Sequence, residues 1–316
     1  MQAMSAALFS TRAASDAAHS GRLALDNGHA MAWSDVGPRS APVALLLHGG
    51  PGSGRSGFMP TCFDAARWRI VAYDQRGSGQ STPAGETRHN QTDDLLADLR
   101  ALRAHLGIER WLVVGGSWGA TLALVHAADA PEAVDGLLLR GVFLARRDDV
   151  EHFFDASAHG LPDPWVPWRR AGEPLAVSLD RVLVEGGDAA RRCVQIWWRW
   201  EQALDGVDAP PIDGDALIAQ MQRYRVQAHY LRQGCGLDER PLLDRLAAVP
   251  KVPTLLLHGT RDRICPPEGA RAVHERLSGS VLRWIDGGHA PTQAAMTHAL
   301  RGAIDEYLGT RAWSPA

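Results

Sequence analysis

The sequence predicts an α/β fold, with a mostly parallel central sheet covered by helices on both faces and a mainly helical insertion. Short apolar runs alternate with helix-patterned stretches over residues 43–139 and again over residues 254–285. Such alternation is typical of parallel sheets built from strand–helix–strand units. It stops over residues 145–250, where helical patterns predominate. With 316 residues, 45% of them hydrophobic, the chain can bury a large core without disulfide bonds.

The first strands are expected at an antiparallel edge of the sheet. Two short runs around Leu23 and Met31 are joined through Asn27-Gly28, a dipeptide that favours a hairpin turn. Six buried strands follow, each of them a short apolar run. They cover residues 43–47, 68–73, 111–114, 134–139, 254–257 and 281–285. Apolar residues at positions 95, 96, 99, 102 and 106 predict an amphipathic helix over residues 93–106.

The insertion is predicted to be a helical cap over residues 145–250, on a core formed by residues 1–144 and 251–316. It contains a proline-rich segment at 162–167, followed by helical patterns that include positions 197–200 and 216–233. An insertion of about a hundred residues has the size of a small domain. We therefore expect it to act as a lid on the α/β core.

The composition excludes several classes of partner. The 33 basic and 36 acidic residues leave a net charge of −3, which provides no field for nucleic acid or an anionic membrane. The longest apolar runs have the length of strands and are far too short to span a membrane. Four cysteines far apart, without a metal-binding spacing, predict a reduced cytoplasmic protein without a metal site. Residues 1–20 lack a sustained apolar stretch, so no signal peptide is expected.

A glycine-rich turn provides a candidate nucleophile. Gly115-Gly-Ser117-Trp-Gly119 directly follows a predicted strand and precedes a helical run. A sharp strand-to-helix turn needs small flanking residues, lifts the serine hydroxyl clear of the sheet and directs a helix N-terminus at it. We therefore predict that Ser117 is a nucleophile.

A second glycine-rich segment provides a candidate oxyanion hole. His48-Gly-Gly50-Pro-Gly52 follows the strand predicted at 43–47. Acyl transfer places negative charge on the substrate carbonyl oxygen, which two converging backbone N–H groups can hold. We expect the amides of Gly50 and Trp118 to be these two donors.

The hydroxyl also needs a base and a carboxylate that orients the base. In α/β-hydrolases the chain order is serine, acid, histidine, with the last two on loops after late strands. Asp262 lies just past the strand predicted at 254–257, and His289 lies just past the strand predicted at 281–285. Asp286 is a rival acid, but it is too close to His289 in the chain to reach the far ring nitrogen. We predict Asp262 as the acid and His289 as the base.

Three motifs together resemble the proline iminopeptidases of the α/β-hydrolase superfamily: residues 48–52 (HGGPG), 74–81 (DQRGSGQS) and 115–120 (GGSWGA). Residues 139–143, 197–201, 259–267 and 288–289 extend the similarity over almost the whole chain after about residue 20. The resemblance implies a serine hydrolase that removes an N-terminal residue, preferentially proline, from short peptides. It implies no metal and no cofactor.

The same resemblance implies residues that bind the substrate. In the family two glutamates of the lid recognise the free amino group, and Glu201 in the pattern W-x-x-W-E matches the first of them. Gln227 stands where the second glutamate is expected, and a neutral amide cannot neutralise an ammonium group. Phe143 and Phe153 resemble positions that form the apolar subsite for the proline ring.

Two alternatives remain open at this stage. Gln227 favours an amide, ester or lactone hydrolase of the same fold without strict N-terminal proline specificity. A non-catalytic binding protein is disfavoured, because it would not need Ser117, Asp262 and His289 together. An epoxide hydrolase or dehalogenase would need aspartate in place of Ser117. The sequence leaves the oligomeric state and the natural substrate open.

Overall fold

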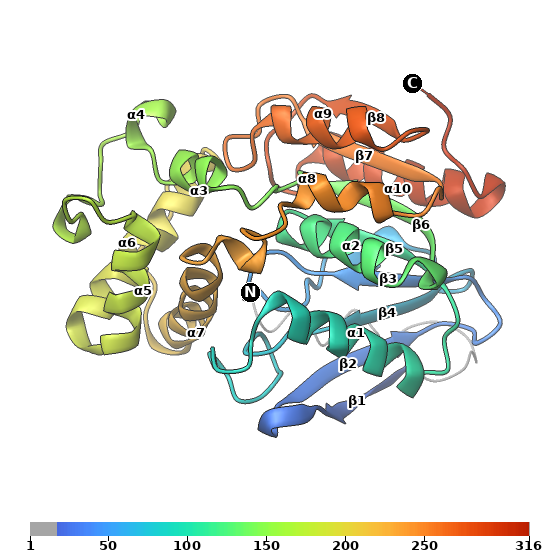
Figure 1. Cartoon of the computed structure of the whole chain (residues 1–316), viewed down its shortest axis with the longest axis horizontal. Helices are drawn as coiled ribbons and strands as arrows, with labels where there is room; N and C mark the ends of the chain where they lie inside the picture. Colours follow the sequence, from blue (N-terminus) through green and yellow to red (C-terminus); the bar gives the residue numbers. More distant parts are fainter. Residues whose placement is uncertain (1–17, 316) are drawn as a thin grey trace.

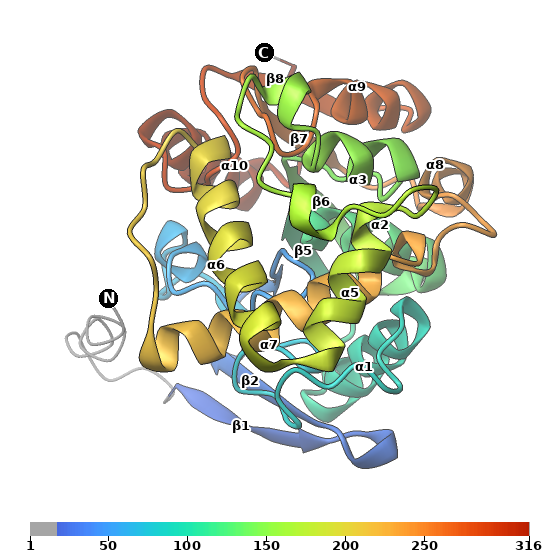
Figure 2. The ribbon, with the colours of Figure 1, turned by 90° about the vertical axis from the view of Figure 1, so that its left-hand side faces the viewer.

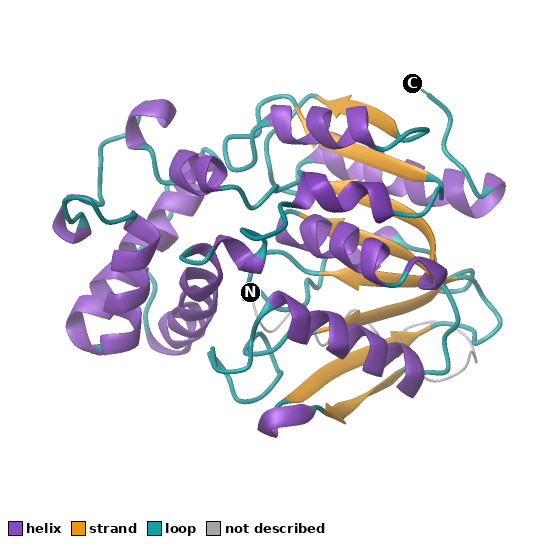
Figure 3. Ribbon diagram, in the orientation of Figure 1, coloured by secondary structure: helices purple, strands orange, loops and turns teal. Residues whose placement is uncertain are grey.

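A computed structural model describes residues 18–315 of the chain. Its described residues form an eight-stranded sheet in the order β1-β2-β4-β3-β5-β6-β7-β8 (Figures 1 and 3). The strands are β1 (His19–Ala24), β2 (Ala30–Val36), β3 (Val43–Leu47), β4 (Arg69–Tyr73), β5 (Trp111–Gly116), β6 (Val134–Arg140), β7 (Thr254–Gly259) and β8 (Val281–Ile285). Strands β3 to β8 pair in parallel, whereas β1 and β2 form the antiparallel edge. The predicted fold class and edge hairpin are confirmed.

Helices cover both faces of the sheet (Figure 1). One face carries α1 (Thr92–His105), α2 (Trp118–Asp129), α8 (Leu242–Arg245) and α9 (Pro267–Arg276), and the other carries α10 (Ala294–Thr310), which was not predicted. Side chains alternate between these faces along each strand. In β3, Leu45 and Leu47 belong to the cluster under α1 and α2, and Ala44 and Leu46 belong to the cluster under α10. Burial on both faces explains why the strands are continuous apolar runs in the sequence.

The segment between β6 and β7 is helical. It contains α3 (Arg147–Phe153), α4 (Ala156–His159), α5 (Leu175–Glu185), α6 (Gly187–Leu204) and α7 (Gly214–Leu231). Figure 2 shows α5, α6 and α7 lying across the end of the sheet, as a lid would. This segment and the sheet side share one hydrophobic cluster, which includes Trp197 of α6 and Trp118 of α2. The division at residues 145 and 250 therefore stays a prediction.

Aromatic packing fixes α6 against α7. The rings of Trp197 and Tyr224 are stacked with centroids 4.7 Å apart. Trp165 packs edge-on against Trp197 and Trp200. Since aromatic pairs have strongly preferred geometries, this packing sets which residues of the two helices face each other.

Two remaining expectations concern the ends of the chain and the membrane. None of the helices in residues 18–315 combines the length and the apolar character needed to cross a membrane. The expectation that residues 1–20 contain no signal peptide falls mostly on residues 1–17, which lie outside the described part.

Candidate active site

Ser117 lies on the sharp turn between β5 and α2. Its backbone has φ 56° and ψ −126°, a conformation that L-residues rarely adopt. The Ser117 amide donates a hydrogen bond to the carbonyl oxygen of Arg140 at 2.9 Å, which ties the turn to the end of β6. Gly119 is needed because a Cβ at this position would overlap the carbonyl group of Leu47. The strain and close packing hold the serine clear of the sheet.

His289 and Asp262 meet beyond the ends of β8 and β7. Nδ1 of His289 lies 2.7 Å from Oδ2 of Asp262. The other carboxylate oxygen accepts from the amides of Ile264 at 3.0 Å and Cys265 at 2.9 Å. Burial alone would raise the pKa of Asp262, but the charge and hydrogen bond of His289 outweigh it and leave this pKa below its ordinary value. The carboxylate is therefore charged and oriented at neutral pH.

The rival acid points elsewhere. The Asp286 side chain is 80% exposed and forms an ion pair with Arg261. Of the two aspartates considered from sequence, it is Asp262 that contacts His289.

The two predicted oxyanion donors are free. Within the described chain, neither the Gly50 amide nor the Trp118 amide donates a hydrogen bond to a protein acceptor. Gly50 has φ +113°, and a Cβ there would lie 2.7 Å from the nitrogen of Gly52. A larger residue would therefore be strained at this position.

Gln75 joins the two segments that carry these amides. Its side-chain Oε1 accepts from Nε1 of Trp118 at 2.9 Å, and its Nε2 donates to the carbonyl of His48 at 3.0 Å. Its backbone amide also donates to Nε2 of His48 at 3.0 Å. All three residues are buried. The 74–81 motif thus holds the two oxyanion segments in a fixed relative position.

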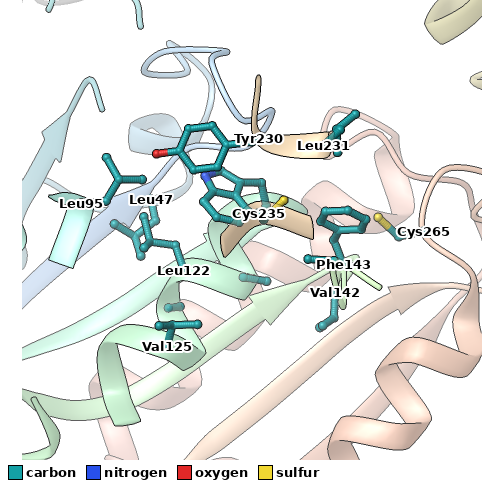
Figure 4. Packing of buried hydrophobic residues seen from close by; sticks show 14 of the residues in the cluster. Leu47, Leu95, Leu122, Val125, Val142, Phe143, Tyr230, Leu231, Cys235 and Cys265 are labelled. Atoms are coloured by element: carbon teal, nitrogen blue, oxygen red, sulfur yellow. The ribbon is translucent and has the colours of Figure 1, made fainter. Parts of the chain in front are cut away.

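One cavity of about 290 Å³ brings most of the predicted residues together. Its lining includes seven of them: Ser117, His289, Gly50, Glu201, Gln227, Phe143 and Phe153. Asp262 lies behind His289, and the side chain of Trp118 is buried beneath the turn. Figure 4 shows Phe143 close to Leu231 and Cys265, which come from distant parts of the chain. All three line the cavity and make part of its wall apolar.

Glu201 does not face the cavity with a free charge. Its Oε2 lies 2.9 Å from Nη2 of Arg223 and 3.1 Å from the hydroxyl of Tyr224. Its Oε1 lies 3.1 Å from the same Arg223 nitrogen and 3.5 Å from Nε2 of Gln227. Arg223 therefore balances the charge of Glu201.

Four cavity or neighbouring residues were not identified from sequence: Arg140, Asp205, Arg223 and Tyr224. Helical spacing could have found three of them. Asp205 follows Glu201 by four positions, and Arg223 and Tyr224 precede Gln227 by four and three positions, so each pair shares a helix face. Arg140, at the end of β6, donates a hydrogen bond to the carbonyl oxygen of His289.

Cys265 contacts the nucleophile. Its Sγ lies 3.9 Å from Oγ of Ser117. Burial raises the pKa of the Cys265 thiol well above its ordinary value. The thiol therefore stays protonated and cannot take a proton from Ser117.

Comparison with known proteins gives consistent matches. A family model described as the alpha/beta hydrolase fold matches residues 42–291. A proline iminopeptidase of Xanthomonas citri is 37% identical over 301 residues, which cover 91% of this chain and 96% of that protein. A probable proline iminopeptidase of Leptolyngbya boryana is 32% identical over 307 residues, covering 92% and 95%.

Solved structures agree at the level of the fold. VinJ has a TM-score of 0.66 at 20% identity, with 92% of this chain and 98% of that chain covered. An esterase from Exiguobacterium antarcticum has a TM-score of 0.62 at 19% identity, with coverages of 92% and 99%. The sequence matches are closer and span nearly the whole length of the relatives. The chain belongs to the proline iminopeptidase family of the α/β-hydrolases.

Proposed function

We propose that the protein is a serine exopeptidase that releases proline, or a similar small residue, from the N-terminus of short peptides. The observation that carries this proposal is the single cavity lined by Ser117, His289, Glu201 and two phenylalanines. Its size suits one small residue, since its volume of about 290 Å³ lies at the lower end for ligand sites. Family membership at 37% identity supports the same activity.

The proposed reaction begins with attack by Ser117 on the carbonyl carbon of the N-terminal residue. Nδ1 of His289 is engaged by Asp262, so Nε2 is the ring nitrogen available to accept the hydroxyl proton. The negative charge that develops on the substrate carbonyl oxygen is held by the amides of Gly50 and Trp118. His289 then returns the proton to the nitrogen of the leaving peptide, and the C–N bond breaks.

The product of this first half is an ester between Oγ of Ser117 and the prolyl carbonyl group. Water attacks the ester carbon, with His289 accepting a proton from the water and returning it to Ser117. The same two amides hold the second oxyanion. Proline leaves as the free acid, and no metal is needed at any step.

Substrate selection is assigned to the wall contributed by the segment between β6 and β7. Phe143 and Phe153 are nine-tenths buried and supply apolar surface for a proline ring. Glu201 and Gln227 lie on α6 and α7 at the same cavity. Because these helices cover the site, a substrate would enter with its N-terminus first, which supports removal of a single terminal residue.

A second candidate function is hydrolysis of amides, esters or lactones without strict specificity for a free N-terminus. The observation that favours it is the pairing of Glu201 with Arg223 at 2.9 Å, next to the neutral Gln227. Both features reduce the negative charge available for an ammonium group.

The decisive experiment compares steady-state kinetics on four substrates. These are the p-nitroanilides of proline, alanine and N-acetylproline, together with p-nitrophenyl acetate. A proline aminopeptidase has its highest kcat/KM on free proline p-nitroanilide and very little activity on the N-acetylated form. Equal kcat/KM on free and N-acetylated proline would instead establish the second candidate.

The proposed location is the cytoplasm, and the proposed partner is a short peptide or amide. All four cysteines are free and buried, which supports a reducing compartment. The net charge of −3 gives no reason to expect nucleic acid or an anionic membrane surface as a partner.

A further inference from the structure

The cavity holds a second carboxylate, which forms no direct ion pair with the described residues. Asp205 is the C-cap residue of α6, four residues after Glu201, and lines the same cavity. Within residues 18–315, no side chain forms an ion pair with Asp205 and no donor contacts its carboxylate oxygens. Glu201, by contrast, is held by Arg223 and Tyr224. Of these two carboxylates, Asp205 is therefore the one without a direct partner, and it can accept a cationic ligand.

A second observation indicates that a polar ligand belongs at this place. Gln227 lines the cavity and is only 6% exposed, and its Oε1 has no hydrogen-bond partner among the described residues. A buried amide oxygen without a donor is costly unless a ligand or water satisfies it. An ammonium or secondary ammonium group carries N–H donors that could supply this bond.

The position of Asp205 also fits the covalent structure of an N-terminal residue. The α-nitrogen is two bonds from the carbonyl carbon that Ser117 would attack, so its partner must lie near the catalytic residues. Asp205 lines the same cavity as Ser117 and His289.

We propose that Asp205 is the carboxylate that binds the substrate α-ammonium group, with the Oε1 of Gln227 as a second acceptor, while Glu201 serves to hold Arg223. This assignment rests on the proposed aminopeptidase activity and names its specificity-determining residue. It differs from the expectation that Glu201 is the carboxylate that binds the amine. In this chain Arg223 takes the charge of Glu201, and Asp205 replaces it one helical turn further along α6.

The test measures kcat and KM of Asp205→Asn on proline p-nitroanilide and on p-nitrophenyl acetate. Asp208→Asn is the matched control, since it removes the same charge from an exposed residue three positions further on. For Asp205→Asn we expect kcat/KM on the anilide to fall about 30-fold more than on the ester, the lower end of the range for unpairing a buried charge. The loss should appear in KM rather than in kcat, because the ammonium is bound in both ground and transition states.

A second variant separates Asp205 from Glu201. Arg223→Met removes the cation that occupies Glu201, so Glu201 should take over the ammonium. In the Arg223→Met background, Asp205→Asn should lower kcat/KM on the anilide by less than half of the factor by which it lowers it in the wild type. If Asp205 were only a structural residue at the end of α6, Asp205→Asn would lower kcat/KM by the same factor in both backgrounds.

Three outcomes would overturn the assignment. Equal kcat/KM of Asp205→Asn and Asp208→Asn on an anilide that the wild type cleaves would show that Asp205 does not bind the amine, and the aminopeptidase function would stand. Equal losses on anilide and ester would identify a structural role. A wild type that cleaves the ester but not the proline anilide would overturn the aminopeptidase function, and the assignment of Asp205 with it.

Discussion

Nη2 of Arg223 lies 2.9 Å from Oε2 of Glu201, across the interface between α6 and α7. An ion pair inside a substrate cavity changes what the cavity can bind, because each charge is already compensated. The family resemblance predicts two glutamates at this wall, and in this chain one is Gln227 and the other is paired. The contact between His289 and Asp262 does not involve this pair. The change therefore concerns substrate recognition, while the hydrolytic residues keep their arrangement.

Replacing the nucleophile gives the simplest prediction. Ser117→Ala should lower kcat on the best substrate by a factor on the order of 10⁶, as in other serine hydrolases, because no other group can attack. The fold should persist, since alanine removes only a hydroxyl group and leaves the turn intact. Thermal unfolding measures the fold, and labelling by a fluorophosphonate measures the nucleophile. Wild-type kcat in this variant would contradict the mechanism.

The assignment of the catalytic acid is tested by replacing two aspartates, of which Asp262 is buried and Asp286 is exposed. Asp262→Asn should lower kcat by about 10⁴, because the amide would present the wrong partner to Nδ1 of His289. Asp286→Asn is the control and should change kcat by less than about twofold, since the Asp286 side chain is 80% exposed. If both variants lose the same activity, the assignment of Asp262 is wrong.

Adding a carboxylate to α7 should improve recognition of the amine. In Gln227→Glu the new carboxylate would lie beside Glu201, and one Arg223 would then face two negative charges. We expect kcat/KM on proline p-nitroanilide to rise about threefold to fivefold, the usual scale for one partly solvated ion pair. N-acetylproline p-nitroanilide is the control substrate, because it has no ammonium group. A parallel rise on both substrates would show a general effect on the cavity.

Much of the core could be predicted because its signals are local. Buried parallel strands are continuous apolar runs, so the predicted bounds 43–47 and 281–285 coincide with β3 and β8. Asp262 and His289 were recognisable because each follows such a strand, and the carboxyl ends of parallel strands meet at one edge of the sheet. Helix α10 was missed, although Met296, Leu300 and Ile304 repeat every four residues on its buried face.

The contacts between α6 and α7 at the cavity could not be predicted in the same way. Whether Arg223 meets Glu201 depends on how α6 crosses α7, and these residues are 22 positions apart. The crossing is set by the stacking of Trp197 on Tyr224, which is a tertiary contact without a local signal. A charged residue on a helix is usually solvated, so its sequence position alone does not indicate a neutralised carboxylate.

The pH dependence provides a last prediction, which again compares two substrates. The charged neighbours of Asp205 are His289, Asp262, Arg140 and Glu201. An ordinary aspartate has a pKa of about 3.9. Burial is the largest effect on Asp205 and raises its pKa, so this carboxylate takes up a proton at a higher pH. As the pH falls through this raised pKa, the ammonium loses its partner and KM for proline p-nitroanilide rises.

Protonation of the catalytic base lowers activity on the anilide and on p-nitrophenyl acetate alike, so the ratio of the two kcat/KM values isolates Asp205. In the wild type this ratio should fall as the pH is lowered from 7, and the fall should begin at a higher pH than an ordinary aspartate would give. In Asp205→Asn the ratio should be low and should not change as the pH is lowered from 7, because position 205 then carries no carboxylate to titrate. A wild-type ratio that stays constant down to pH 4 would show that the charge of Asp205 does not take part in binding the substrate.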